Sequence, residues 1–165
     1  MSSTITVAYA STVQIVETFS GAQSGDPTAT FGPYNDADTL TAATSVPVTK
    51  HADFDQALST GTATINLQAL PGKTADETIV GTGLKVQILK LRNKSTNANK
   101  ITATKGASNG YGLDAAGASW TIALDPGQSA LLILKDSAPD IAAGARTIDL
   151  TGTGSQVLEV EVVMG

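Results

Sequence analysis

Residues 156–163, QVLEVEVV, decide the fold class of this chain. Leu158, Val160 and Val162 are separated by single glutamates. Because successive side chains of a β-strand point to opposite faces, this alternation predicts a strand with one buried face and one face in water.

The same period of two recurs in both directions from this stretch. Residues 63–67 alternate apolar and polar side chains, and a short strand begins at Ile101. Residues 120–134 are typical of a hairpin, with the turn Asp125-Pro126-Gly127-Gln128 between two apolar segments. Only residues 51–58, HADFDQAL, fit a helical turn. The pattern as a whole predicts an all-β chain folded as a β-sandwich or a barrel.

One predicted strand changes phase along its length. Leu84, Val86 and Ile88 share one periodicity, whereas Leu89 and Leu91 continue it with an offset of one residue. A β-bulge, or a strand covered on both faces, accounts for the offset.

The first 50 residues have a different character. Residues 5–9 and 13–19 predict two strands that pair, and residues 21–38 are rich in Gly, Pro, Asp and Ser. We expect a long loop there with at most one short strand, in which Phe31 and Tyr34 are the only large apolar side chains. Loops of this length in small domains are usually functional, flexible or bound to something.

The composition of the 165-residue chain excludes several classes of function. A net charge of −5 disfavours nucleic acid as a partner, and the absence of cysteine removes disulfides and thiolate chemistry. Residues 1–9 have neither the basic start nor the apolar run that is typical of a signal peptide, so we expect none. The longest apolar stretch is far shorter than the roughly 20 residues that a membrane helix needs. We therefore expect a chain made in a cytoplasm, with no membrane partner.

Few side chains have the spacing of a catalytic or metal site. The pairs Asp36/Asp38 and Asp53/Asp55 lack the Gly and Glu of a calcium loop, and we interpret them as solvated or capping carboxylates. His51 is the only histidine, so neither a serine–histidine triad nor a histidine metal pair is supported. We predict no catalytic residue, no cofactor, no metal and no small-molecule ligand.

Two further features have a structural and a functional interpretation. Trp120 is in phase with Ile122 and Leu124, which favours core packing over a ligand platform. Most of the cations lie in the middle of the chain, which favours a solvated sheet face or a protected edge over a docking site for an acidic protein. These cations are Lys85, Lys90, Arg92, Lys94, Lys100 and Lys105.

Four segments between residues 50 and 165 carry a family resemblance: LQALPGKTADETIVGTG (67–83), residues 84–111, WTIALDPGQSALLILKD (120–136) and IDLTGTGSQVLEVEVVMG (148–165). They resemble small β-sandwich proteins of tailed-phage structural clusters, similar to jelly-roll capsid decoration, or cement, proteins. The resemblance implies a jelly-roll-like antiparallel β-sandwich at 51–165. Residues 1–50 lie outside it, and we expect extended N-terminal strands and a loop there that form an arm or are part of the same domain.

The same resemblance implies a function. It predicts a virion structural protein on the outer capsid surface, a homotrimer that binds the major capsid protein and stabilises the shell. Such proteins often reach across a neighbour with an N-terminal segment, so the expected interface residues are Ile5, Val7, Tyr9, Phe31 and Tyr34. Residues 4–9 and 158–163 are candidates for strand pairing between chains, since terminal strands leave backbone groups unpaired.

Two alternatives remain open at this point. One is a carbohydrate-binding or adhesin module on a fibre or cell surface, with Trp120 and Tyr111 as candidate sugar platforms. The other is a β-protein of a phage tail or baseplate, which only its location in the particle would distinguish from a decoration protein.

Overall fold

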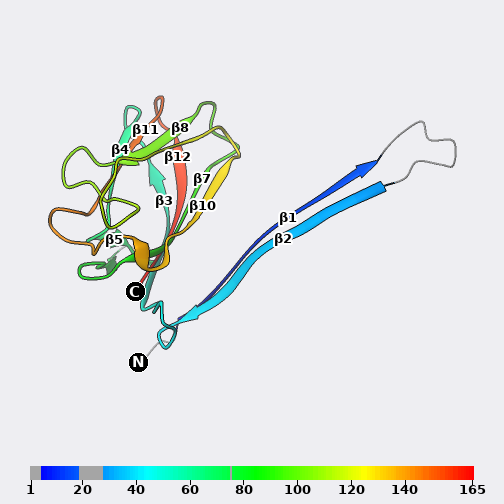
Figure 1. The fold of residues 1–165 in the computed structure, drawn as a ribbon. Helices are drawn as coiled ribbons and strands as arrows, with labels where there is room; N and C mark the ends of the chain where they lie inside the picture. The colour runs from blue at the N-terminus through cyan, green and yellow to red at the C-terminus, as the bar shows by residue number, and fades with distance from the viewer. Residues whose placement is uncertain (1–4, 19–27, 75) are drawn as a thin grey trace.

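A two-stranded arm projects from a body of two packed β-sheets (Figure 1). The computed structural model describes residues 5–18, 28–74 and 76–165. The strands are β1 (Thr6–Thr18), β2 (Thr28–Thr41), β3 (Lys50–Ala57), β4 (Thr62–Asn66), β5 (Leu70–Pro71), β6 (Thr78–Ile79), β7 (Val86–Asn93), β8 (Ile101–Lys105), β9 (Thr121–Leu124), β10 (Ser129–Ile133), β11 (Thr147–Thr151) and β12 (Val157–Met164), and the 3-10 turn η1 is Lys135–Ser137.

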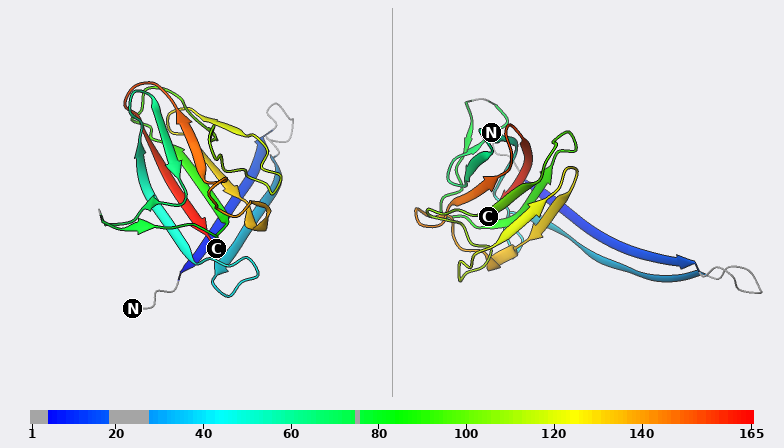
Figure 2. Two further views of the ribbon diagram at one scale, coloured as in Figure 1. Left: turned by 90° about the vertical axis from the view of Figure 1, so that its left-hand side faces the viewer. Right: turned by 90° about the horizontal axis from the view of Figure 1, so that it is seen from above.

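The body is an antiparallel β-sandwich (Figure 2). The front sheet has the strand order β10-β7-β12-β3, and the back sheet has the order β4-β11-β8-β9. Leu158, Val160 and Val162 point inward from β12 and are fully buried against Ile148 and Leu150 of the back sheet, which lie in the same apolar cluster. The predicted all-β class and the sandwich architecture are confirmed.

Strand β7 shows both features that its change of phase predicts. Val163 of β12 pairs with Ile88, and Met164 pairs with Val86, so Gln87 is the extra residue of a bulge. All residues from Val86 to Leu89 are buried, which means that this part of the strand is covered on both faces. Ile88 therefore packs outside the sandwich core, in a second apolar cluster described below.

The helical turn predicted at residues 51–58 is wrong. This segment is β3, which pairs in register with β12 from Lys50–Met164 to Ala57–Val157. Its apolar side chains Ala52 and Phe54 are two residues apart and pack on the core. A continuous partner strand imposes a period of two that short-range helix propensity does not overcome.

The predicted hairpin at residues 120–134 is also wrong, although its turn is correct. Gln128 N donates to the carbonyl oxygen of Asp125 at 2.9 Å, and Gly127 takes the positive φ of +84° that the turn requires. However, β9 pairs with β8 in the back sheet, whereas β10 pairs with β7 in the front sheet. The turn therefore connects the two sheets. The hairpin prediction is wrong because an alternating pattern identifies a strand but does not specify which strand pairs with it.

The N-terminal region differs most from the prediction. Residues 6–18 form one strand, β1, instead of two paired strands, and residues 28–38 of the predicted loop belong to β2. Polar residues form this strand because β1 supplies a backbone partner along its length. The remaining loop residues, and Phe19, lie outside the described residues.

The prediction that residues 158–163 pair with another chain is wrong, although this strand is the last in the chain. Strand β12 lies between β7 and β3, so residues 158–163 have hydrogen-bonded neighbours on both sides, and pairing with another chain is excluded there. The body begins at Lys50 with β3. A division of the chain into separate units near residue 50 stays a prediction, since apolar contacts join the arm to the body.

Tyr111 links three segments of the body from a fully buried position. Its hydroxyl accepts a hydrogen bond from the backbone N–H of Val86 at 3.0 Å and donates to the carbonyl oxygen of Pro139 at 2.7 Å. The Trp120 indole Nε1 donates to the Tyr111 carbonyl oxygen at 2.8 Å, and its ring packs on the core. The predicted core role of Trp120 is confirmed.

We predict that Tyr111→Phe lowers the free energy of unfolding at neutral pH by about 1–3 kcal/mol, because the Val86 N–H is left buried without an acceptor. Burial raises the pKa of Tyr111 from 10.0 to about 12, an increase to which Asp140 adds. A raised phenol pKa stabilises the folded state fully below pH 10, and this stabilisation is lost as the pH rises towards 12. Denaturant titrations at several pH values should show a steeper loss over this range in the parent chain than in the variant. Parallel losses would contradict the assignment.

Candidate interaction surface

An apolar row crosses the outer face of the front sheet at one end. Ile133 of β10, Ile88 of β7 and Val163 of β12 are cross-strand neighbours. The three strands bury their inward-facing side chains in the sandwich core, whereas this row faces outward. It must therefore be covered by another part of the chain. The base of the arm supplies it: Tyr9 and Leu40 are buried in the same cluster as Ile88 and Val163.

The arm root, defined as Ile5, Val7, Tyr9 and Leu40, owes its apolar face to strand periodicity. Val7 and Tyr9 are two residues apart on β1, and Leu40 of β2 is the register partner of Val7. Cross-strand partners occupy the same face of a sheet, so one face of the ribbon presents three apolar side chains to the body. Val46 and Val48 complete the cluster from the segment that leads into β3.

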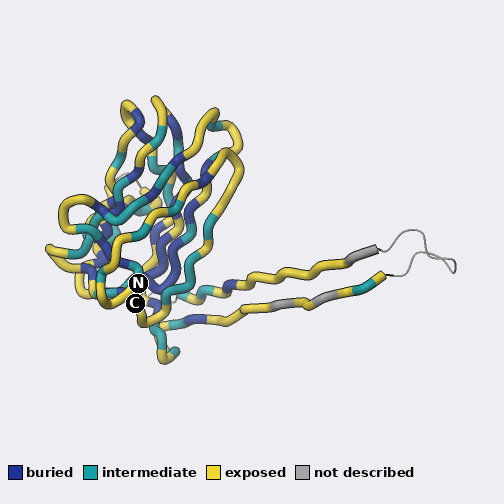
Figure 3. The backbone as a smooth tube through the Cα atoms, turned by 45° about the horizontal axis from the view of Figure 1, so that its top comes forward, coloured by how far each residue is buried: buried dark blue, intermediate teal, exposed yellow. Residues whose placement is uncertain are grey.

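Beyond the root, the ribbon extends away from the body, and no other part of the described chain packs on residues 11–16. We define the distal arm as residues 11–18 and 28–36. Every residue from 11 to 16 is exposed (Figure 3). Val13, Ile15 and Val16 are 54%, 53% and 59% exposed, and they are three of the five exposed large apolar residues in the described part of the chain. An isolated two-stranded ribbon is marginally stable in water, which makes the distal arm a candidate half of an interface.

The structure divides the predicted interface residues into two groups. Ile5, Val7 and Tyr9 belong to the arm root and pack against the body of their own chain. Phe31 and Tyr34 are at the register positions opposite Ile15 and Val13, in the distal arm. Contact of either group with another chain stays a prediction.

The sequence does not predict the role of several residues of this surface. Val13 and Ile15 are expected as strand residues only, and Leu40, Ile88 and Val163 are not predicted to cover one another. A signal was present in the consecutive apolar residues Val162-Val163-Met164, because a strand with one wet face does not need an apolar side chain at all three positions.

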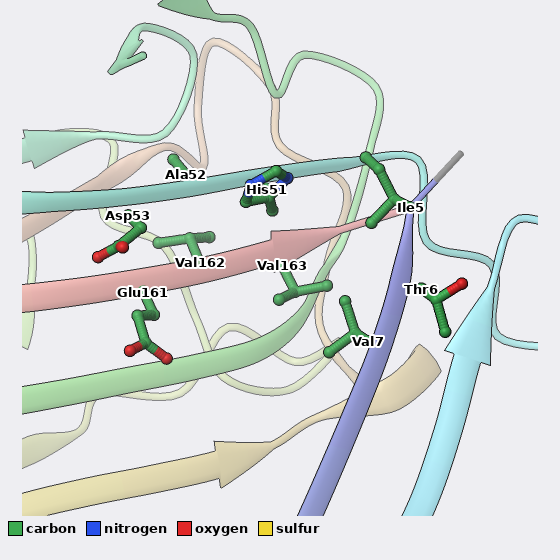
Figure 4. A pocket seen from close by; sticks show the side chains of 9 residues that line it. All are labelled: Ile5, Thr6, Val7, His51, Ala52, Asp53, Glu161, Val162 and Val163. Carbon is green, nitrogen blue, oxygen red and sulfur yellow. The ribbon is translucent and has the colours of Figure 1, made fainter. Parts of the chain in front are cut away.

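A groove of about 370 Å³ lies where the arm meets the front sheet (Figure 4). Ile5 and Val7 form one wall, and His51, Asp53 and Glu161 project from β3 and β12. The carboxylate of Glu161 accepts a hydrogen bond from Lys90 Nζ at 2.9 Å. No three His, Asp or Glu side chains of the described residues are grouped as metal ligands. The groove thus presents a mixed polar and apolar surface.

Three of the central cations are paired on the outer face of the front sheet. Lys90 and Arg92 of β7 lie opposite Glu161 and Glu159 of β12 and contact them at 2.9 and 3.1 Å. Lys94 Nζ lies 2.6 Å from an Asp55 oxygen. Exposed pairs of this kind contribute at most about 1 kcal/mol each. They favour the interpretation of these cations as part of a solvated sheet face.

No family model matches the chain, and no curated protein or solved structure matches it. Within the residues that the structure describes, no helix has the length and apolar character required to span a membrane.

We predict that Leu40→Ala detaches the arm without unfolding the body. Leu40 is buried in the apolar cluster between the arm root and the front sheet, and not in the sandwich core. Its truncation should lower the free energy of detaching the arm from the body by about 2–5 kcal/mol. Hydrogen exchange should show faster exchange of the Val7 and Tyr9 amides, with unchanged protection in β12.

Leu91→Ala is the matched control, since Leu91 is fully buried in the sandwich core. It should lower the free energy of unfolding of the whole body and accelerate exchange in β12. Equal effects of the two variants on β12 would contradict a separately anchored arm.

Proposed function

We propose that this chain is a non-enzymatic virion structural protein, a jelly-roll-like decoration protein that binds the outer surface of a phage capsid and stabilises the shell. The observation that carries the proposal is the distal arm, whose side chains at residues 11–16 are exposed in this chain although three of them are large and apolar. The resemblance of residues 50–165 to phage structural proteins supports the same conclusion.

The form of the molecule suits such a function. A sandwich body is a rigid platform, and its apolar anchor at the arm root sets the direction in which the ribbon leaves. On a closed symmetric shell, many copies bind at once, so modest contacts by each arm add up through avidity. In this proposal the partner is the major capsid protein, and the protein acts as a homotrimer.

The carbohydrate-binding alternative is less well supported. A sugar platform needs an exposed aromatic face, but Tyr111 is fully buried. Trp120 is half-buried, with its ring packed on the core and its indole nitrogen bonded internally. A tail or baseplate protein would use the same arm, and the position of the protein in the particle separates that alternative from a decoration protein.

We predict that a chain with residues 11–36 replaced by Asn-Gly retains its body but loses its effect on the shell. The replacement joins Ala10 to its register partner Ala37 by a two-residue turn and keeps the arm root. Purified protein should be added to shells stripped of it, and their thermal disruption followed by light scattering. The parent chain should raise the disruption temperature, and the shortened chain should not.

Two measurements keep this result interpretable. The thermal midpoint of the shortened chain alone should match the parent, which shows that the body is folded. If the parent chain neither binds stripped shells nor raises their disruption temperature, the proposed function is wrong; if the shortened chain protects as well as the parent, the arm does not carry it.

A further inference from the structure

The net negative charge of this protein is concentrated in its first 49 residues, which include the strands of the arm. The first 49 residues contain four carboxylates, Glu17, Asp26, Asp36 and Asp38, and no Lys or Arg. The remaining residues contain all ten cations and eleven acids, for a net charge of −1. The N-terminal region therefore accounts for −4 of the net charge of −5.

Two of these acids lie on the arm face that also carries apolar residues. Going outward from the body along β2, Leu40 is followed at strand spacing by Asp38 and Asp36, whose register partners on β1 are Tyr9 and Ser11. The next positions on that face are Val13 and Ile15 of β1. Leu40 is buried on the body, Asp38 and Asp36 are exposed, and Val13 and Ile15 are exposed. The face thus places a pair of carboxylates beside an uncovered apolar patch.

A second arm does not complement this face. Two arms packed face to face would set Asp36 and Asp38 against the same carboxylates or against Val13 and Ile15 of the second copy. The first 49 residues hold no cation to pair with them, so either arrangement is unfavourable. The body of a second copy offers little apolar surface: in the described residues its exposed large apolar side chains are Leu131 on β10 and Val80 after β6. Strand β6 contacts β3, so these two residues flank opposite edges of the front sheet.

We propose that this face of the distal arm docks in an apolar groove of the shell subunit that is rimmed by Lys or Arg side chains. The apolar floor receives Val13 and Ile15, and the cations face Asp36 and Asp38. This assignment rests on the proposed function and adds to it the chemistry of the partner surface. Charge complementarity supplies selectivity and faster association, whereas the apolar contacts supply most of the affinity.

The test measures binding of the full-length protein to stripped shells at low and high salt, with two double variants. Asp36→Asn with Asp38→Asn should weaken binding about tenfold at low salt and match the parent in about 1 M salt, where screening removes the charge contribution. Val13→Ser with Ile15→Ser should weaken binding at least about tenfold at both salt concentrations, because loss of apolar burial is not screened.

Matched controls come from the body. Asp76 and Asp125 are exposed and form no ion pair within the described residues, so Asp76→Asn with Asp125→Asn changes the net charge equally. Leu131→Ser with Val80→Ser removes the exposed apolar side chains of the body. Both control variants should bind as the parent does.

The outcomes separate the two proposals. If the parent binds and Asp36→Asn with Asp38→Asn binds equally at low salt, the basic rim is wrong while the proposed function stands. If the parent self-associates in sedimentation and Val13→Ser with Ile15→Ser abolishes this, the occupant is a second copy and the docking assignment is overturned. If the parent does not bind shells at all, the proposed function fails and the shell groove fails with it.

Discussion

Strand β12 is the constraint on which the rest of the structure depends, because its side chains take part in three different surfaces. Its inward residues, among them Leu158 and Val160, are fully buried in the sandwich core. Its outward glutamates pair with cations of β7, and its outward Val163 lies beneath the arm root. A shift of its register by one residue would exchange all of these faces together, so the core, the charged outer face and the arm anchor are specified jointly.

Prediction from the sequence succeeds where the information is local. The alternation of residues 63–67 and 156–163 identifies β4 and β12, and the offset in residues 84–91 reveals the bulge at Gln87. It fails where structure depends on a distant partner. Residues 51–58 form a strand because β12 pairs with them, and β9 and β10 separate into two sheets because their pairing partners, β8 and β7, lie elsewhere in the chain.

The candidate surface shows the same limit. Ile5, Val7 and Tyr9 are recognisable as one face of a strand, but the pattern does not reveal whether that face meets another chain or its own body. The structure shows that it meets the body, at Ile88 and Val163. The distal apolar residues Val13 and Ile15 are identified as an uncovered patch only once β2 is known to continue the ribbon past the body.

The ribbon form of the arm has an energetic consequence for binding. Ordering a disordered segment on a partner costs about 1–2 kcal/mol of backbone entropy per residue, whereas a ribbon that is already paired has met much of this cost before contact. Paired strands also satisfy half of the backbone hydrogen-bonding groups, and their side chains are held in a fixed alternating order. At about 3.3 Å per residue, Val13 and Ile15 lie about 13 and 20 Å beyond the anchored Tyr9 along β1. The root anchors one end of the ribbon through Tyr9 and Leu40, so the body sets the direction in which Val13 and Ile15 are presented.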